Sequence, residues 1–185
     1  MLALVVAAAS LNAEPSFGRR QAVLAIAVST LPPAAARADS DLQPKLRNLP
    51  AAKLAEIVRD DLVQRQFLAT GDFTRAIYDE GALFTDEIDT YTLPKFIKGT
   101  SALFLPSRSK VFLVGDVMAD ANEVSFRFDE DLCFNIPFNP VVTVTGRCVL
   151  TRDPESGLVV KYREYWDKTP NEVVLTAFKS KPQRS

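Results

Sequence analysis

Residues 123–136 read Glu-Val-Ser-Phe-Arg-Phe-Asp-Glu-Asp-Leu-Cys-Phe-Asn-Ile, with apolar side chains at almost every even position. Such alternation is typical of a β-strand that packs one face on a core and exposes the other to water. The same parity continues in residues 141–152 and 158–167, so we expect the even-numbered side chains of all three strands to face one core. Residues 110–118 are apolar at odd and even positions alike, which predicts a central strand covered on both faces.

Helical patterns precede these strands. Apolar residues recur at three- to five-residue steps after Pro50 and predict a helix that ends at Gly71, followed by a short helix over 73–78. Residues 82–91 alternate as a strand, and a third helix follows Thr92 and ends before Pro106. Residues 169–172 read Thr-Pro-Asn-Glu, a capping box that opens a last helix. Helices followed by a run of long antiparallel strands indicate the α+β fold class.

The composition excludes several classes of function. The chain of 185 residues carries 22 Lys and Arg, 23 Asp and Glu, and no His. A nearly neutral chain without a basic stripe is not expected to bind nucleic acid. The lack of His excludes His-based catalytic triads and His-ligated zinc. No acidic cluster has the spacing of a calcium loop and no Gly-rich phosphate loop is present, so we expect neither a metal nor a cofactor.

Residues 1–38 have the pattern of a cleaved targeting sequence. A first apolar run is followed by a pair of arginines, a second apolar run at 22–31 and an Ala-x-Ala site. These parts make an export signal, and the paired arginines indicate the twin-arginine route. Neither run approaches the roughly 20 residues that span a bilayer, so the protein is not expected to be membrane-spanning. The residues that carry the signal are Arg19, Arg20, Ala36 and Ala38.

Two apolar signals in series indicate a nested route. The arrangement resembles lumenal preproteins of algae with secondary plastids, with residues 1–16 as the first part and 17–38 as the thylakoid signal. The expected location is therefore the thylakoid lumen of a plastid, with a bacterial periplasm as the alternative. After the signal we expect a loose polar leader at 39–48, a single domain at 49–180 and a tail at 181–185.

Several short motifs accompany the element order: Tyr78, the run Phe84-Thr85-Asp86, Gly146 in the penultimate strand, and the closing Tyr-Arg-Glu-Tyr-Trp-Asp at 162–167. Together they resemble the nuclear-transport-factor-2-like superfamily, which includes ketosteroid-isomerase-like and SnoaL-like proteins, over about residues 49–178. The resemblance implies a cone, in which a curved antiparallel sheet wraps over N-terminal helices around an internal pocket. More narrowly, the chain is similar to a plastid branch of unknown function. The superfamily includes isomerases, dehydratases and non-catalytic members, so the fold alone gives no activity.

Three acidic residues interrupt the apolar faces, namely Asp86, Glu130 and Glu164. An unpaired carboxylate there is costly, so each should be paired, protonated or adjacent to a wet cavity. One interpretation is a pocket whose acids move a proton on a ligand, with Tyr78, Tyr91 or Tyr162 as hydrogen-bond donors. The favoured interpretation is structural, with the acids bonded to Tyr hydroxyls, Thr or a helix N-terminus where strands leave the core. The expected pocket lining is Tyr78, Phe84, Asp86, Phe128, Glu130, Val144, Tyr162, Glu164 and Trp166.

The two cysteines, Cys133 and Cys148, have opposite parity. Parity places Cys133 on the outer face of its strand and Cys148 on the inner face. A disulfide requires Cβ atoms roughly 4 Å apart, so we do not expect these cysteines to form one.

The leading hypothesis is a non-catalytic lumenal binding or assembly module of a photosynthetic membrane. It would dock on a thylakoid membrane-protein complex or hold a small apolar ligand in its cone. The strand at 110–118, if covered on both faces, would support a homodimer or a partner surface on the sheet. The alternative hypothesis is a cofactor-free isomerase or lyase that uses Asp86, Glu130 or Glu164 as general acid or base.

Overall fold

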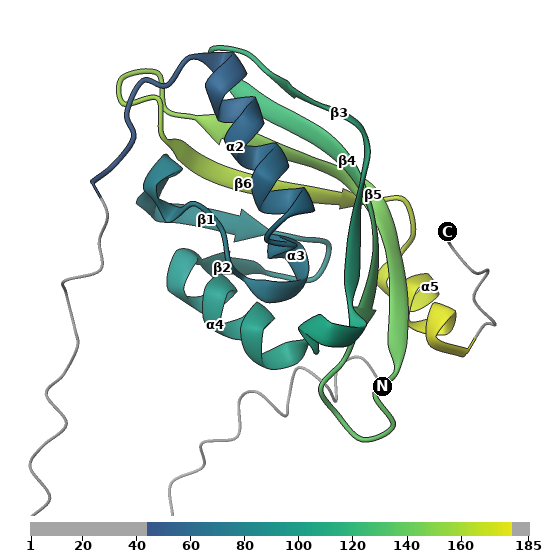
Figure 1. The fold of residues 1–185 in the computed structure, drawn as a ribbon. Helices are drawn as coiled ribbons and strands as arrows, with labels where there is room; N and C mark the ends of the chain where they lie inside the picture. The colour runs from purple at the N-terminus through teal and green to yellow at the C-terminus, as the bar shows by residue number, and fades with distance from the viewer. Residues whose placement is uncertain (1–43, 179–185) are drawn as a thin grey trace, which may run out of the picture. The chain divides into compact units, whose positions relative to one another are not determined.

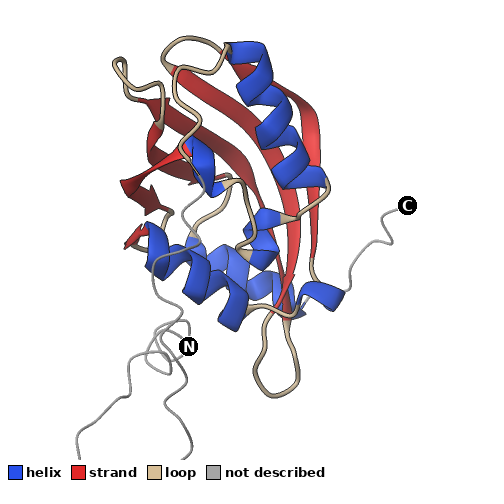
Figure 2. Cartoon of the chain, turned by 60° about the vertical axis from the view of Figure 1, so that its left-hand side comes forward, coloured by secondary structure: helices blue, strands red, loops and turns tan. Residues whose placement is uncertain are grey.

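The computed structural model describes residues 44–178 (Figure 1). The predicted targeting sequence, most of the predicted leader and the tail lie outside the described residues, and so do the signal residues Arg19, Arg20, Ala36 and Ala38. The described part is an α+β domain, which confirms the predicted fold class. A curved sheet carries helices on its concave face, and a short C-terminal helix lies on the other side (Figures 1 and 2).

The elements follow one another along the chain in the order α2 (Ala51–Val63), α3 (Phe67–Thr70), η1 (Arg75–Ile77), β1 (Tyr78–Thr85), β2 (Thr90–Thr92), α4 (Leu93–Leu103), η2 (Pro106–Arg108), β3 (Lys110–Ala119), β4 (Glu123–Cys133), β5 (Val141–Arg152), β6 (Val159–Trp166), α5 (Pro170–Leu175) and η3 (Thr176–Phe178). The six strands form one sheet in the order β2-β1-β6-β5-β4-β3. Neighbouring strands are antiparallel except β1 and β6, which run parallel. The sheet is therefore mixed, because β1 joins it beside the last strand of the chain. No helix within 44–178 has both the length and the apolar character that a membrane crossing requires.

The parity prediction is confirmed along the central strands. Val124, Phe126 and Phe128 of β4 are buried, as are Val144 and Leu150 of β5. On β6 the prediction is wrong at the start, where Val159 rather than Val160 is buried. The cause is a register shift opposite Thr151 and Arg152, because one extra residue in a strand reverses the faces that follow it.

Strand β3 lies at the edge of the sheet, so the predicted central position is wrong. Its odd positions Val111, Leu113 and Val117 pack against the core, where α2 lies against the strand. On the other face, Val114 is 43 % and Met118 66 % exposed. An apolar run does not by itself distinguish a covered face from an exposed edge. The predicted dimer or partner surface on the sheet is therefore no longer supported by a central position of this strand.

The single helix predicted to end at Gly71 is divided at Gln66, whose φ of 57° is left-handed. The Gln66 side chain donates to the carbonyl oxygens of Leu62 at 2.9 Å and Val111 at 3.0 Å. It also accepts from the Val111 amide at 2.7 Å. One amide group thus closes the end of α2 and bonds the backbone of edge strand β3.

The strand predicted at 82–91 is two strands, β1 and β2, joined by a tight turn at Asp86. The Asp86 carboxylate accepts from the amides of Ile88 at 2.7 Å and Asp89 at 2.8 Å, which is typical of an Asx turn. The short helix predicted at 73–78 is the single 3-10 turn η1. The capping box that opens α5 is confirmed, because Thr169 accepts from the Glu172 amide and Glu172 bonds back to it.

The described end of the predicted leader, residues 44–48, is bonded to the domain, so the prediction that this part is loose is wrong. The Leu46 amide donates to the Ala76 carbonyl at 2.9 Å, and the Asn48 amide donates to the Ser156 carbonyl at 2.9 Å. Lys45 Nζ donates to the Tyr78 carbonyl at 2.7 Å. The polar composition of this segment predicted exposure to solvent. Backbone groups, however, make the bonds of Leu46 and Asn48, and such bonds do not depend on the side chains.

Candidate functional site

Two glutamates lie on the concave, core-facing side of the sheet. Glu130 is on β4 and 3 % exposed, and Glu164 is on β6 and 7 % exposed. Their even numbers place them on the face that packs on the core. Carboxyl groups are seldom buried to this extent without partners, so the contacts of each determine what it can do.

Both oxygens of Glu164 accept hydrogen bonds from its own strand. Oε1 accepts from the Tyr162 hydroxyl, and Oε2 accepts from Trp166 Nε1 at 2.8 Å. Residues two apart on a strand share a face, so the sequence Tyr-x-Glu-x-Trp brings the three groups together. Burial raises the pKa of Glu164 to about 7, and the bonds from Trp166 and Tyr162 oppose that rise. Glu164 is therefore poised to gain or lose a proton near neutral pH.

Glu130 is different, because its Oε2 is buried and has no hydrogen-bond partner among the described residues. Burial raises the pKa of Glu130 well above the ordinary value, and the charges of Glu164, Asp86 and Asp131 raise it further. Both effects favour the protonated form of Glu130, in which the carboxyl group offers a donor as well as an acceptor. Two acids with different environments in one interior have the properties of a general acid and a general base.

Asp86 lies at the rim of this region, in the turn between β1 and β2. Burial raises its pKa, and the amides of Asp89 and Ile88 lower it. Arg163 of β6 closes the turn by donating to the Asp86 carbonyl oxygen and, at 2.8 Å, to the Glu87 carboxylate. The pKa of Tyr91 is raised to about 12, first by burial and then by Asp86, Asp89 and Glu164.

Aromatic rings fill the space beside the acids. The Phe84 ring stacks on Phe96 with 4.3 Å between centroids and on Tyr162 with 4.8 Å. Tyr78 stacks on the same Phe84 ring at 5.4 Å. This aromatic stack ends at the Tyr162 hydroxyl that bonds Glu164.

The structure places the residues expected to line a pocket as follows. Glu130, Glu164, Tyr162 and Trp166 come together through β4 and β6, while Asp86 lies in a turn and not on a strand. Phe96 of α4 was not predicted as a site residue, although the helical pattern of apolar residues after Thr92 includes it. The expected lining residues that are buried on the core side are Tyr78, Phe84, Phe128, Glu130, Val144, Tyr162 and Glu164; Trp166 is half-buried there.

Both cysteines are free and buried. Parity placed Cys133 on the outer face of its strand, and the thiol is nonetheless buried, because the chain beyond β4 covers the end of the strand and the thiol lies 3.5 Å from the Asn139 carbonyl oxygen. In the β4–β5 register, Cys133 pairs with Val141 and Cys148 with Phe126, so the two thiols lie at opposite ends of the hairpin. That separation is too large for a disulfide.

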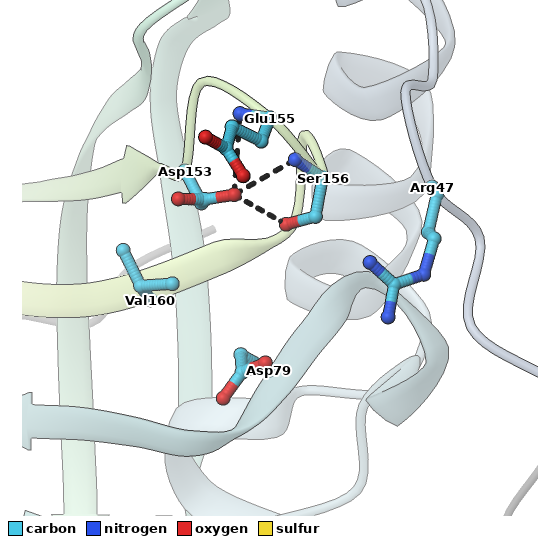
Figure 3. Close-up of a pocket in the computed structure, with 6 residues that line it drawn as sticks. All are labelled: Arg47, Asp79, Asp153, Glu155, Ser156 and Val160. Carbon is cyan, nitrogen blue, oxygen red and sulfur yellow. Dashed lines mark hydrogen bonds between the residues drawn. The ribbon is translucent and has the colours of Figure 1, made fainter.

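A surface groove of about 590 Å³ lies near the β5–β6 turn (Figure 3). The Asp153 carboxylate stabilises the turn, since it accepts hydrogen bonds from the amide and the hydroxyl of Ser156, each at 2.7 Å. No residue expected at a site lines the groove. The lining residues are Arg47, Asp79, Asp153, Glu155, Ser156 and Val160. Over residues 44–178, no group of three or more Cys, Asp or Glu side chains is arranged to hold a metal ion.

Comparison with solved structures identifies the fold. The chain is similar to a candidate SnoaL-like polyketide cyclase from Jannaschia sp. CCS1, with a TM-score of 0.52, 17 % identity, and coverage of 71 % of this chain and 95 % of that one. An LEH-like epoxide hydrolase from M. tuberculosis follows with a TM-score of 0.48 and 14 % identity, covering 69 % and 90 %. An NTF2-like protein from Anabaena variabilis ATCC 29413 has a TM-score of 0.44 and 16 % identity, covering 64 % and 90 %. No protein-family model and no curated protein sequence matches the chain. The first similarity shows the SnoaL-like, nuclear-transport-factor-2-like fold, and fold does not imply activity.

Proposed function

We propose that this domain binds a small, largely apolar ligand against the concave face of its sheet, with Glu130 as the group that hydrogen-bonds it. The observation that carries the proposal is the unpartnered Oε2 of Glu130. Nearby polar groups satisfy one another, because Tyr162 and Trp166 both donate to Glu164. An unpartnered buried polar atom costs about 1–3 kcal/mol, and native proteins keep few of them. A ligand polar group would supply the missing partner.

This proposal favours one form of the expected binding module over the other. Docking on a thylakoid membrane complex drew its support from a central β3, and β3 is an edge strand. The hypothesis that the domain holds a ligand is supported by the unpartnered Oε2 of Glu130. The location remains part of the proposal: the twin-arginine pattern before residue 39 supports a thylakoid lumen, with a bacterial periplasm as the alternative.

A second candidate function is cofactor-free proton transfer, as in an isomerase or a lyase. The observation that favours it is the pKa of about 7 at Glu164 together with the pKa of Glu130, which burial raises well above its ordinary value. Glu164 would take a proton from the ligand while Glu130 donates one to it. In that case ligand bound in D₂O exchanges a hydrogen in the wild-type protein and not in Glu164→Gln. Binding without exchange would leave the non-catalytic function.

The test of binding uses Trp166, which is the single tryptophan of the chain and donates to Glu164. Small cyclic compounds are titrated into the purified protein while its fluorescence is followed. We expect a saturable change in the wild-type protein, with Kd at least tenfold weaker in Glu130→Leu. Glu123→Leu, at the exposed start of the same strand, serves as the control and should bind as the wild type does.

The stability of Glu130→Leu separates a functional role from a structural one. Leu fills a similar volume and removes the unpartnered acid, so the variant should unfold at an equal or higher temperature. A variant that is less stable and binds as well as the wild type would contradict the proposal.

A further inference from the structure

We propose that the ligand of this interior site is a cation, an amine carried on an apolar body, in preference to a neutral alcohol or a carboxylate. The inference rests on the proposed function, because it takes Glu130 as the ligand's partner. It is carried by the unpartnered Oε2 of Glu130, the sign of the surrounding charges and the aromatic stack beside them.

The charges that face Glu130 are almost all acidic. Glu164 contributes from β6, Asp86 from the β1–β2 turn and Asp131 from β4 itself. The guanidinium of Arg163 acts on Glu164 and Asp86 of this cluster, and it is already bonded to the Asp86 carbonyl oxygen and to Glu87. Arg152, the buried Arg of the described core, donates instead to the main-chain carbonyls of Leu49, Asp120 and Gly157.

The tyrosines around the cluster report the same negative field. The pKa of Tyr91 on β2 rises to about 12 because of burial, Asp86, Asp89 and Glu164. The pKa of Tyr162 is well above the ordinary value because of burial, then Cys148, Glu164 and Glu130. In a medium of low dielectric constant such a field opposes an anion and attracts a cation.

The aromatic stack adds a second attraction. Phe84, Phe96 and Tyr162 have ring centroids 4.3–5.8 Å apart, and Tyr162 carries the stack to the Glu164 carboxyl group. The faces of aromatic rings attract cations, and an apolar body packs against the same rings. An ammonium group at Glu130 Oε2 would give that atom its missing partner while the ligand body contacts the stack.

The release of protons on binding distinguishes an amine ligand from a neutral ligand. Burial and the neighbouring carboxylates favour the protonated form of Glu130, and an ammonium group at Oε2 favours the carboxylate, so binding of the amine should release protons to the buffer. A neutral alcohol accepts or donates a hydrogen bond without that release. Affinity for the amine should therefore rise with pH while the amine remains charged, and affinity for the alcohol should not.

The experiment compares three probes of one shape: cyclohexylmethylamine, cyclohexylmethanol and cyclohexanecarboxylate. Calorimetry at pH 7 in two buffers of different ionisation heat gives both Kd and the number of protons released. We expect the amine to bind at least tenfold tighter than the alcohol with protons released to the buffer, and the carboxylate not to bind. Equal or tighter binding of the alcohol, or any binding of the carboxylate, overturns the inference and leaves the proposed function standing. If none of the three binds and a wider panel leaves Trp166 unchanged, the proposed function itself fails.

Matched variants assign the effect to Glu130. Glu130→Gln keeps the shape and removes the ionisable group, so the amine should fall to the affinity of the alcohol and release fewer protons than with the wild type. The alcohol should bind this variant within twofold of the wild type, which shows that the site is still folded. Glu123→Gln makes the same change at the exposed start of β4 and should alter neither ligand. Unchanged amine binding in Glu130→Gln contradicts the inference.

Discussion

Glu130 and Glu164 are the same residue type on the same face of one sheet, and their neighbours along the strand make them different. Glu164 lies between Tyr162 and Trp166, which donate to both of its oxygens. Glu130 lies between Phe128 and Leu132, which have no donor to offer. The sequence two positions on either side therefore accounts for one satisfied acid and one unpartnered acid.

At the scale of the residue, the stability of the protein should depend on pH partly through Glu164. Its pKa is about 7 in the folded protein against an ordinary 4.5, so between these values the folded state holds a proton that the unfolded chain has released. Glu164 should therefore lower the free energy of unfolding by on the order of 3 kcal/mol as pH rises from about 4.5 to about 7, and Glu130, whose pKa is also raised, acts in the same direction. Urea unfolding across this range measures it, and Trp166 fluorescence should titrate with a midpoint near 7.

Glu164→Gln tests the assignment of that pH dependence. The variant should reduce the slope in this range and remove the fluorescence titration, while Glu123→Gln at the exposed start of β4 should retain both. An unchanged slope in Glu164→Gln would assign the pH dependence to other groups.

At the scale of the element, the close approach of β5 and β6 depends on Gly146. A Cβ placed there would lie 2.4 Å from the Tyr165 carbonyl oxygen and 3.2 Å from the Trp166 Cα. Gly146 is paired with Phe128 of β4 on one side and with Trp166 of β6 on the other. The close approach of β6 to Gly146 therefore occurs beside Trp166, which is a residue of the site. Only the missing side chain lets the two backbones approach in this way.

Gly146→Ala should therefore lower the free energy of unfolding by about 1–3 kcal/mol, because the added methyl group has no space. It should also change the fluorescence of Trp166, whose backbone must shift. Gly99→Ala on α4 is the matched control, since a Cβ there meets nothing within 4 Å. In an exposed helix that change should stabilise by up to about 1 kcal/mol. Equal effects of the two substitutions would contradict this explanation.

At the scale of the whole molecule, one buried side chain fastens three separate segments. Arg152 donates to the Leu49 carbonyl before α2, to the Asp120 carbonyl in the β3–β4 turn, and to the Gly157 carbonyl in the β5–β6 turn. The distances are 2.8, 2.8 and 3.2 Å respectively. Arg152 therefore holds the start of the helical layer against the end of the sheet.

Arg152→Met should lower the free energy of unfolding by about 1–3 kcal/mol, because three partly buried carbonyl groups lose a charged donor. Arg152→Lys should recover part of the loss, since an ammonium group lacks the fork that reaches all three. Arg147→Lys, exposed on the same strand, should change stability by less than about 0.5 kcal/mol. Denaturant unfolding measures all three variants, and a neutral Arg152→Met would show that the segments are held by other contacts.

Several features follow from the sequence alone. Alternation over 123–136 was enough to predict the core face of β4, because a strand has a period of two. The helix over Leu93–Leu103 and the capping box at Thr169 and Glu172 depend on neighbours within one turn, so they too were readable. The burial of Glu130 and Glu164 follows from the same parity, which is why the sequence alone predicted both as candidate site residues.

Other features depend on contacts between residues far apart in the chain. The edge position of β3 and the parallel pairing of β1 with β6 are choices among strand orders that the same apolar pattern allows. The break at Gln66 depends on a backbone group 45 residues away, and the burial of Cys133 depends on the loop that folds over it. Local sequence thus determined which side chains face the core and which acids can find a partner on their own strand. Only the tertiary structure decided that no other element within residues 44–178 satisfies Glu130 Oε2, because that depends on all the side chains packed around it.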